Sequence, residues 1–247
     1  MSCSYNSSTL YGGVCGHNIV IMNEAKMYAA PPGLDERLKV YGLSPDQVQL
    51  ENLTLGEGEC FHLTQRADSR FGKAARQVPF KTVADLKSLI GVPDSVVQQY
   101  CRCRFEPDLS ETVPPGFKSI NETTPAQRET LRLAAKEYVH GNSESVIHYE
   151  SALNQGVSIV NRSFITIFLF QDIIVERNAT LTLDASVNVV FANKILVKLG
   201  GKIRALAPYV KYDCISAQGE ELPYIHFAGV LTSVQAGGLS KSTILHF

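Results

Sequence analysis

The sequence predicts an α+β protein, in which a mixed and helical N-terminal segment precedes a short parallel β-solenoid, or β-helix, with coils of about 22 residues. Three observations predict this class. Apolar stripes with helical spacing are confined to residues 81–153. β-Branched residues and short alternating runs dominate after residue 156. Within that β-rich region, one stretch of sequence repeats at a constant spacing.

The composition is that of an ordinary globular protein. The chain has 247 residues, a formal net charge of −1 and 45% hydrophobic residues, which excludes collagen-like, fully disordered and disulfide-miniprotein classes. Because the chain lacks an overall basic footprint, we expect no nucleic-acid partner. The length allows one large domain or two small ones.

The start of the chain shows no targeting segment. Residues 1–8 carry neither the basic nor the apolar part of a secretion signal. The most apolar run, residues 164–175, contains Gln171 and Asp172 and is too short to span a bilayer. We therefore expect a soluble protein without a membrane span, cytoplasmic by default, with secretion by a signal-independent route as the alternative. In that setting the six cysteines are expected to be free thiols.

The first part of the chain, to about residue 80, reads as irregular. Residues 18–23 are a candidate for a short buried strand. Ser44-Pro45 indicates a helix start or a turn. Residues 48–55 alternate weakly between apolar and polar side chains.

Helices are predicted next. Thr82 is placed to cap a short helix that Gly91 ends. Thr124-Pro125 combines a capping threonine with a proline at the first helical position, and Gly141 closes this second helix. The second helix carries one apolar stripe, formed by Leu131, Ala134, Ala135 and Tyr138.

A last helix is expected from a cap at Ser143 to near Gly156. We place the organisational boundary there, at about residue 155. Residues 1–155 form the irregular and helical region, and residues 156–247 form the β-rich region with the solenoid-like repeat.

The repeat aligns residues 167–185 with residues 189–207 at an offset of 22, without gaps, so that Ile173 meets Ile195. A unit of this length is typical of one coil of a parallel β-solenoid. One coil cannot bury its interior alone, and a stacked copy pairs the backbone and places like residues over like. A fainter earlier copy is predicted at residues 153–161.

Charged residues favour the same register. Asp172 would face Lys194, and Glu176 would face Lys198, as opposite charges on adjacent coils. The alternative fold for the C-terminal part is an antiparallel β-sandwich. In its coils punctuated by Asn and Gly with Val and Ile interiors, the segment 153–207 resembles bacterial β-helical proteins, and the resemblance is one of architecture.

A duplicated Cys-x-His motif is the candidate metal site. Cys15-Gly-His17 and Cys60-Phe-His62 offer two thiolates and two imidazoles, which are ligands that zinc takes in tetrahedral sites. The competing interpretation is separate buried thiols and surface histidines. No cofactor is expected overall, and zinc at these four residues is the alternative.

Acidic residues in the β-rich region raise a second kind of chemistry. Asp172, Glu176 and Asp184 are the carboxylates that a lyase or hydrolase built on a β-helix would need to gather on one face. The sequence assigns none of them, nor any other residue, a catalytic role.

The function expected from these features is that of a non-enzymatic binding or self-assembling protein, in a surface-attachment, toxin-like or scaffold role. Its partner would be a glycan, a protein or a second copy joined through the open edges of the solenoid. The alternatives are a carbohydrate-active enzyme (lyase or hydrolase) on a β-helix and a metal-binding module at the N-terminus.

Overall fold

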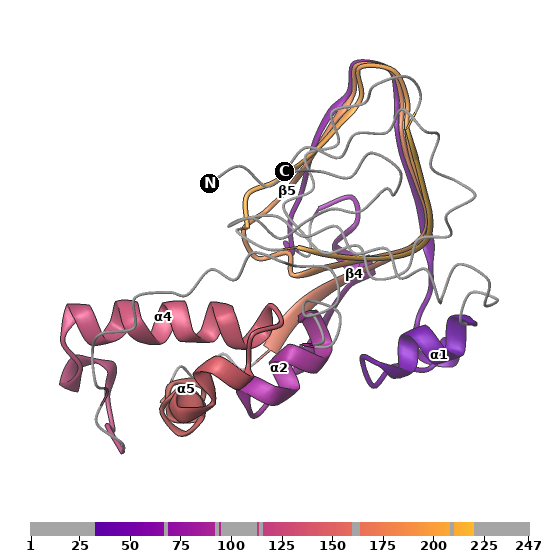
Figure 1. Cartoon of the computed structure of the whole chain (residues 1–247). Coiled ribbons are helices and arrows are strands. Elements are labelled where there is room, and N and C mark those ends of the chain that lie inside the picture. The colour runs from indigo at the N-terminus through magenta and orange to yellow at the C-terminus, as the bar shows by residue number, and fades with distance from the viewer. Residues whose placement is uncertain are drawn as a thin grey trace, which may run out of the picture. The chain divides into compact units, whose positions relative to one another are not determined.

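The computed structural model describes residues 33–66, 69–91, 94, 113, 116–159, 164–207 and 210–219. The chain divides into two compact units, which are described separately (Figure 1). The β unit contains the residues up to Val78 and those from Ile165 onward. The helical unit comprises Pro79–Phe164. The strand candidate at residues 18–23 lies outside the described residues.

The strands of the β unit form two parallel sheets. They are β1 (Glu51–Leu55), β2 (Cys60–Leu63), β3 (Ala75–Pro79), β4 (Phe164–Val175), β5 (Thr180–Leu183), β6 (Val189–Val197), β7 (Lys202–Ala205) and β8 (Lys211–Gly219). One sheet has the order β1-β4-β6-β8, with β3 also paired to β4, and the other has the order β2-β5-β7. Neighbours along both orders run parallel. The antiparallel sandwich is therefore wrong, because consecutive strands turn a corner instead of folding back as hairpins.

The register predicted from the repeat is confirmed. Ile173 of β4 pairs with Ile195 of β6. Leu181 of β5 pairs with Ile203 of β7, which is the same separation of 22 residues. The separation holds once more in β8, where Lys211 pairs with Val189. In Figure 1 these strands lie over one another along the same outline.

The earlier copy predicted at residues 153–161 is wrong. Leu153 lies within helix α5 (Glu150–Ile159) and is buried there among other helices. The position before β4 is taken by β1, whose Leu53 pairs with Ile173, and β2 pairs with β5 in the same way. Apolar residues with loose spacing did not distinguish a helix from a strand in this segment.

The helical unit therefore interrupts the β unit in sequence. The chain forms β1 to β3, continues into the helical unit, and returns as β4. This division differs from the boundary expected near residue 155, because strands on both sides of the helices belong to one sheet.

The turn that leads from one sheet to the other has the same backbone conformation after β1, after β4 and after β6. Gly58, Asn178 and Gly200 all have positive φ, at 70°, 56° and 71°. The Gly58 N–H donates to the carbonyl oxygen of Arg177 (2.9 Å), and the Asn178 N–H donates to that of Leu199 (3.2 Å). Glycine and asparagine adopt this left-handed conformation at the least cost, so the turns stack as the strands do.

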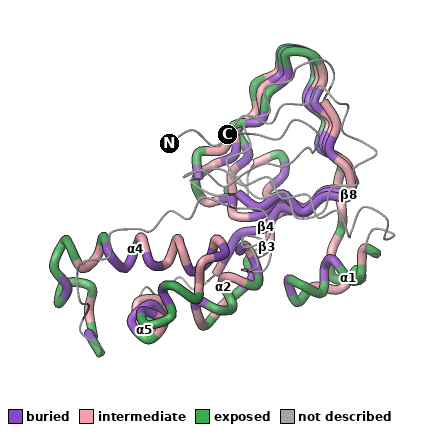
Figure 2. Tube along the Cα trace, in the orientation of Figure 1, coloured by how far each residue is buried: buried purple, intermediate pink, exposed green. Residues whose placement is uncertain are grey.

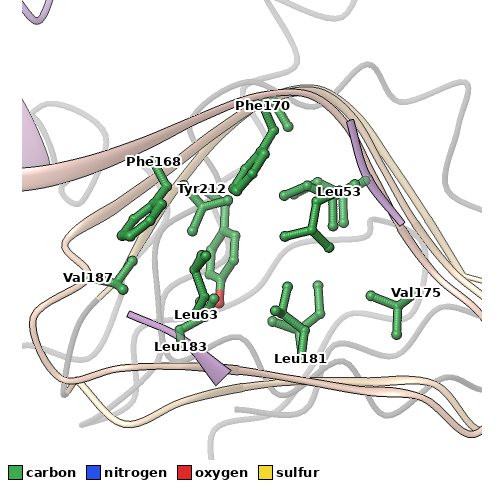
Figure 3. Close-up of a cluster of buried hydrophobic side chains, with 14 of the residues drawn as sticks. Leu53, Leu63, Phe168, Phe170, Val175, Leu181, Leu183, Val187 and Tyr212 are labelled. Atoms are coloured by element: carbon green, nitrogen blue, oxygen red, sulfur yellow. The ribbon is translucent and has the colours of Figure 1, made fainter. Parts of the chain in front are cut away.

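Inward side chains fill the β unit with aliphatic and aromatic residues. Figure 3 shows Phe168, Phe170, Leu181 and Leu183 pointing into this interior. Buried and more exposed positions alternate along β5 and β7, whereas the first parts of β4, β6 and β8 contain consecutive buried residues (Figure 2). Each such side chain contributes about 1.5–3 kcal/mol relative to exposure, so the interior holds the stacked copies together.

Helix α1 (Leu34–Lys39) lies on the outward side of β6 and β8. A buried ion pair connects it to β8. Arg37 is 3% exposed, and its Nε donates to Asp213 Oδ1 at 2.9 Å. The Tyr41 hydroxyl donates to the other carboxylate oxygen of Asp213, also at 2.9 Å. The Arg37 guanidinium lies 4.0 Å from the centre of the buried Phe191 ring. This arrangement satisfies both charges away from water.

The helical unit confirms two of the three predicted N-terminal caps, Thr82 and Thr124. The helical unit contains α2 (Val83–Ile90), η4 (Ile120–Glu122), α4 (Pro125–Val139), η5 (Glu144–Tyr149) and α5 (Glu150–Ile159). The β unit contains two short 3₁₀ helices, η2 (Pro45–Gln47) and η3 (Gly72–Ala74). Thr82 and Thr124 each accept a hydrogen bond from the third residue of their helix. Ser143 makes no such cap, and the segment after it forms the 3₁₀ helix η5 before α5 begins.

We expect Gly91→Ala to destabilise the helical unit by roughly 1–3 kcal/mol. A Cβ at this position would lie 2.5 Å from the carbonyl oxygens of Lys87 and Val139, at the ends of α2 and α4. The matched control is Gly156→Ala in α5, where a Cβ has nothing within 4 Å and helix propensity should add about 0.5–1 kcal/mol. Urea unfolding followed by circular dichroism measures both, and equal effects would contradict the close approach.

We expect Arg37→Met to cost roughly 3–5 kcal/mol, because it leaves the buried Asp213 carboxylate without its cation. The control is Arg70→Met, which removes an exposed ion pair with Glu59 and should cost about 1 kcal/mol or less. Chemical unfolding of the three proteins provides the measurement. If Arg37→Met were no more destabilising than Arg70→Met, the ion pair would not hold α1 in place.

Candidate functional site

The outward side of the sheet β2-β5-β7 is the candidate functional site. The three strands alternate, with buried Leu63, Leu181, Leu183 and Ile203 directed to the core. The remaining side chains of the alternation, at six positions, point away from it. These outward residues, which we call the polar face, are Cys60, His62, Thr180, Thr182, Lys202 and Arg204.

The polar face is ordered in two rows across the strands. Cys60 pairs with Thr180, which in turn pairs with Lys202. The second row repeats this arrangement with His62, Thr182 and Arg204. Neighbouring residues in a row are separated by the strand spacing of about 4.8 Å, and the two rows by about 7 Å along the strand. Backbone pairing therefore fixes these side chains on a regular surface.

The six side chains of the polar face include two cations, Lys202 and Arg204, and no acid. Lys202 and Arg204 are exposed, and no ion pair of either is found among the described residues. Asp184 lies beside the face, with its Oδ2 3.6 Å from Nε2 of His62. Hydrogen bonds from the Ser186 backbone N–H and hydroxyl lower the pKa of Asp184, and His62 adds to this. Asp184 is thus held charged at the margin of the face.

Half of the predicted zinc site can be placed. Cys60 and His62 lie on the same side of β2, and both are exposed. Cys15 and His17 lie outside the described residues. Among the residues that are described, no group of three or more His, Cys, Asp or Glu side chains could hold a metal ion. The four-ligand zinc site stays a prediction.

Each of the three carboxylates considered for glycan chemistry lies beside a lysine or a serine of the β unit. Asp172 pairs in register with Lys194. Glu176 forms an ion pair with Lys198 at 2.8 Å. Asp184 accepts hydrogen bonds from Ser186, at 3.0 Å from the backbone N–H and 2.8 Å from the hydroxyl. The first two pairs are the ones that the repeat predicted.

Sequence reasoning missed the contribution of β5 and β7 to this site. Thr180, Thr182, Lys202 and Arg204 are ordinary outward residues of alternating strands, and no motif marks them. The signal that could have found them is the register itself, since an offset of 22 places Thr180 beside Lys202 and Thr182 beside Arg204.

The helical unit contains a separate cluster of polar side chains, formed by Lys87, Asp94 and Ser143. Lys87 Nζ contacts Asp94 and lies 2.8 Å from the Ser143 hydroxyl, which itself donates to Asp94 at 2.6 Å. The three side chains satisfy one another in a closed network. The Lys87 bond and the Ser143 bond lower the pKa of Asp94 against the effect of its burial. Asp94 is therefore a weak base, and the cluster serves to connect α2 to the start of η5.

Comparison with models of known protein families, with curated proteins and with solved structures finds no match for this chain.

None of the helices in the described part of the chain has both the length and the apolar character needed to cross a membrane.

We expect the helical unit to lose stability as the pH falls from about 6.5 to 4 because of His140. Burial, with Lys136 nearby, lowers the pKa of His140 to about 4 from 6.5. Between these values the unfolded chain binds a proton that the folded chain does not, so stability is complete above pH 6.5 and falls by roughly 2–3 kcal/mol by pH 4.

Unfolding curves at a series of pH values test this expectation. His140→Gln should remove most of the dependence in this range, whereas His148→Gln, at an exposed position, should leave it unchanged. A wild-type pH dependence that persists in His140→Gln would assign the effect to other groups.

Proposed function

We propose that the chain is a non-enzymatic binding protein, that its β unit is a short parallel β-solenoid, and that the polar face is its binding surface. The observation that carries the proposal is the polar face itself, in which six outward side chains from three paired strands form one contiguous surface without an acid among them.

The solenoid interpretation is supported by the constant register. The separation of 22 residues recurs from β4 to β6, from β5 to β7 and from β6 to β8. Like residues stand over like, as with Val175 and Val197. Repeated corners with the same backbone conformation are what stacked coils require. Such a framework is rigid where successive copies pair, as β4 does with β6 and β5 with β7.

A binding role agrees better with the polar face than a catalytic role does. General acid–base catalysis needs titratable groups that converge on one reacting bond. The carboxylates Asp172 and Glu176 face lysines of the neighbouring strand, and Asp184 is engaged by Ser186. A rigid, regular, polar surface suits instead the recognition of an extended partner. The alternative function is a carbohydrate-active enzyme, lyase or hydrolase, on the same scaffold.

The proposal is tested by binding and turnover on one panel of neutral and acidic oligosaccharides. Wild-type protein should bind at least one member and release no product. The isosteric double change Thr180→Val with Thr182→Val should weaken that binding roughly tenfold, because it removes two hydroxyls from the face. Valine favours strands, so the fold should persist.

The matched control is Thr54→Val, an exposed position of β1 in the other sheet, which should leave binding unchanged. Product release by wild-type protein would favour the enzyme. Binding that is insensitive to the double change, or no binding to any member, would reject the polar face as the glycan-binding surface. Self-assembly through strand edges stays a prediction, and size-exclusion chromatography with light scattering tests it on the same samples.

A further inference from the structure

We infer that the polar face binds an acidic polysaccharide, in which carboxylate or sulfate groups recur along a chain of sugar hydroxyls. This inference rests on the proposed binding function and names the ligand class for the same face.

The first argument is charge complementarity. Lys202 and Arg204 stand two residues apart on β7, both exposed, and neither has an ion pair among the described residues. His62 adds a third nitrogen group, but the Asp184 carboxylate lies 3.6 Å from its Nε2, so the positive charge of the surface comes from Lys202 and Arg204. Because the whole chain has a net charge of −1, this positive character is local and does not arise from a basic protein. Arginine binds planar oxyanions through two parallel N–H bonds, and lysine binds them as a point charge.

The second argument is the pairing of each cation with a hydroxyl. Thr180 lies beside Lys202, and Thr182 lies beside Arg204, in the register of β5 and β7. The same combination of one cation and one hydroxyl thus occurs twice along the strands, about 7 Å apart. A polymer that alternates anionic groups with hydroxyls presents the complementary pattern, since a threonine hydroxyl both donates and accepts hydrogen bonds.

The residue types of the face favour a polysaccharide over a single-stranded nucleic acid. Single-stranded nucleic acids are bound by basic grooves in which aromatic side chains stack on the bases. The six outward positions contain no phenylalanine, tyrosine or tryptophan, and Phe61 between them packs on the core. The face therefore offers hydroxyls and cations but no stacking surface.

The experiment compares four immobilised probes: polygalacturonate, dextran sulfate, uncharged dextran and single-stranded poly(dT) DNA. The 247-residue chain should bind at least one of the two acidic polysaccharides at low ionic strength, and binding should weaken as salt is added. It should bind dextran and poly(dT) at least about tenfold more weakly. The double variant Lys202→Glu with Arg204→Glu should weaken binding of the acidic polysaccharides at least about tenfold.

The matched control is Lys73→Glu with Lys118→Glu, which changes the net charge equally at two exposed positions outside the three strands that carry the face. This control should bind like wild type, and circular dichroism should give the same spectrum for all three proteins. If both double variants weakened binding equally, the effect would be one of net charge and the inference would be overturned.

The remaining outcomes separate the inference from the function on which it rests. Equal or tighter binding of uncharged dextran, lost in the Thr180→Val and Thr182→Val protein, would overturn the acidic ligand and keep the face as a binding surface. Preferred binding of poly(dT) through Lys202 and Arg204 would replace the polysaccharide with a nucleic acid. Binding of no probe, or cleavage of any of them, would overturn both proposals.

Discussion

Constant-register pairing of parallel strands is the interaction on which the β unit depends. Each copy must return to the position directly beside the previous one, and the pairing keeps the same separation of 22 residues from β4 to β6, from β5 to β7 and from β6 to β8. This requirement accounts for the positive φ that Asn178 and Gly200 share at one corner. It also accounts for the ion pair of Glu176 with Lys198, because the same constraint that stacks apolar residues inside stacks charges outside.

The contribution of sequence reasoning to the fold follows from distance along the chain. Adjacent copies could be aligned directly, which is why Ile173 over Ile195 was predicted correctly. The copy that contains Leu53 was missed because the helical unit separates it from its partner strand by more than 100 residues. The copy in β8 was missed for another reason. Its outward Asp213 breaks the apolar pattern, and only the structure shows that Arg37 compensates this charge.

The candidate site shows the same limit more strongly. Cys60 and His62 can be identified as candidates in the sequence because they form a Cys-x-His motif. Lys202 and Arg204 belong to no motif. A strand sequence tells which residues share one side of that strand, but it does not tell which strand lies beside it. The polar face exists only once β5 is placed between β2 and β7, and its charge and hydroxyl pattern is a property of that order.

The interruption of the β unit by the helices bears on how the protein is made. During synthesis β1 and β2 leave the ribosome long before β4 and β5, the strands against which they pair. Until then Leu53 and Leu55, fully buried in the finished protein, have no sheet to cover them. While the helical unit is translated, β1 and β2 therefore have apolar side chains and backbone groups without their partner strands. We therefore expect β1 and β2 to pair late in folding, because pairing across so many residues requires a long loop to close first.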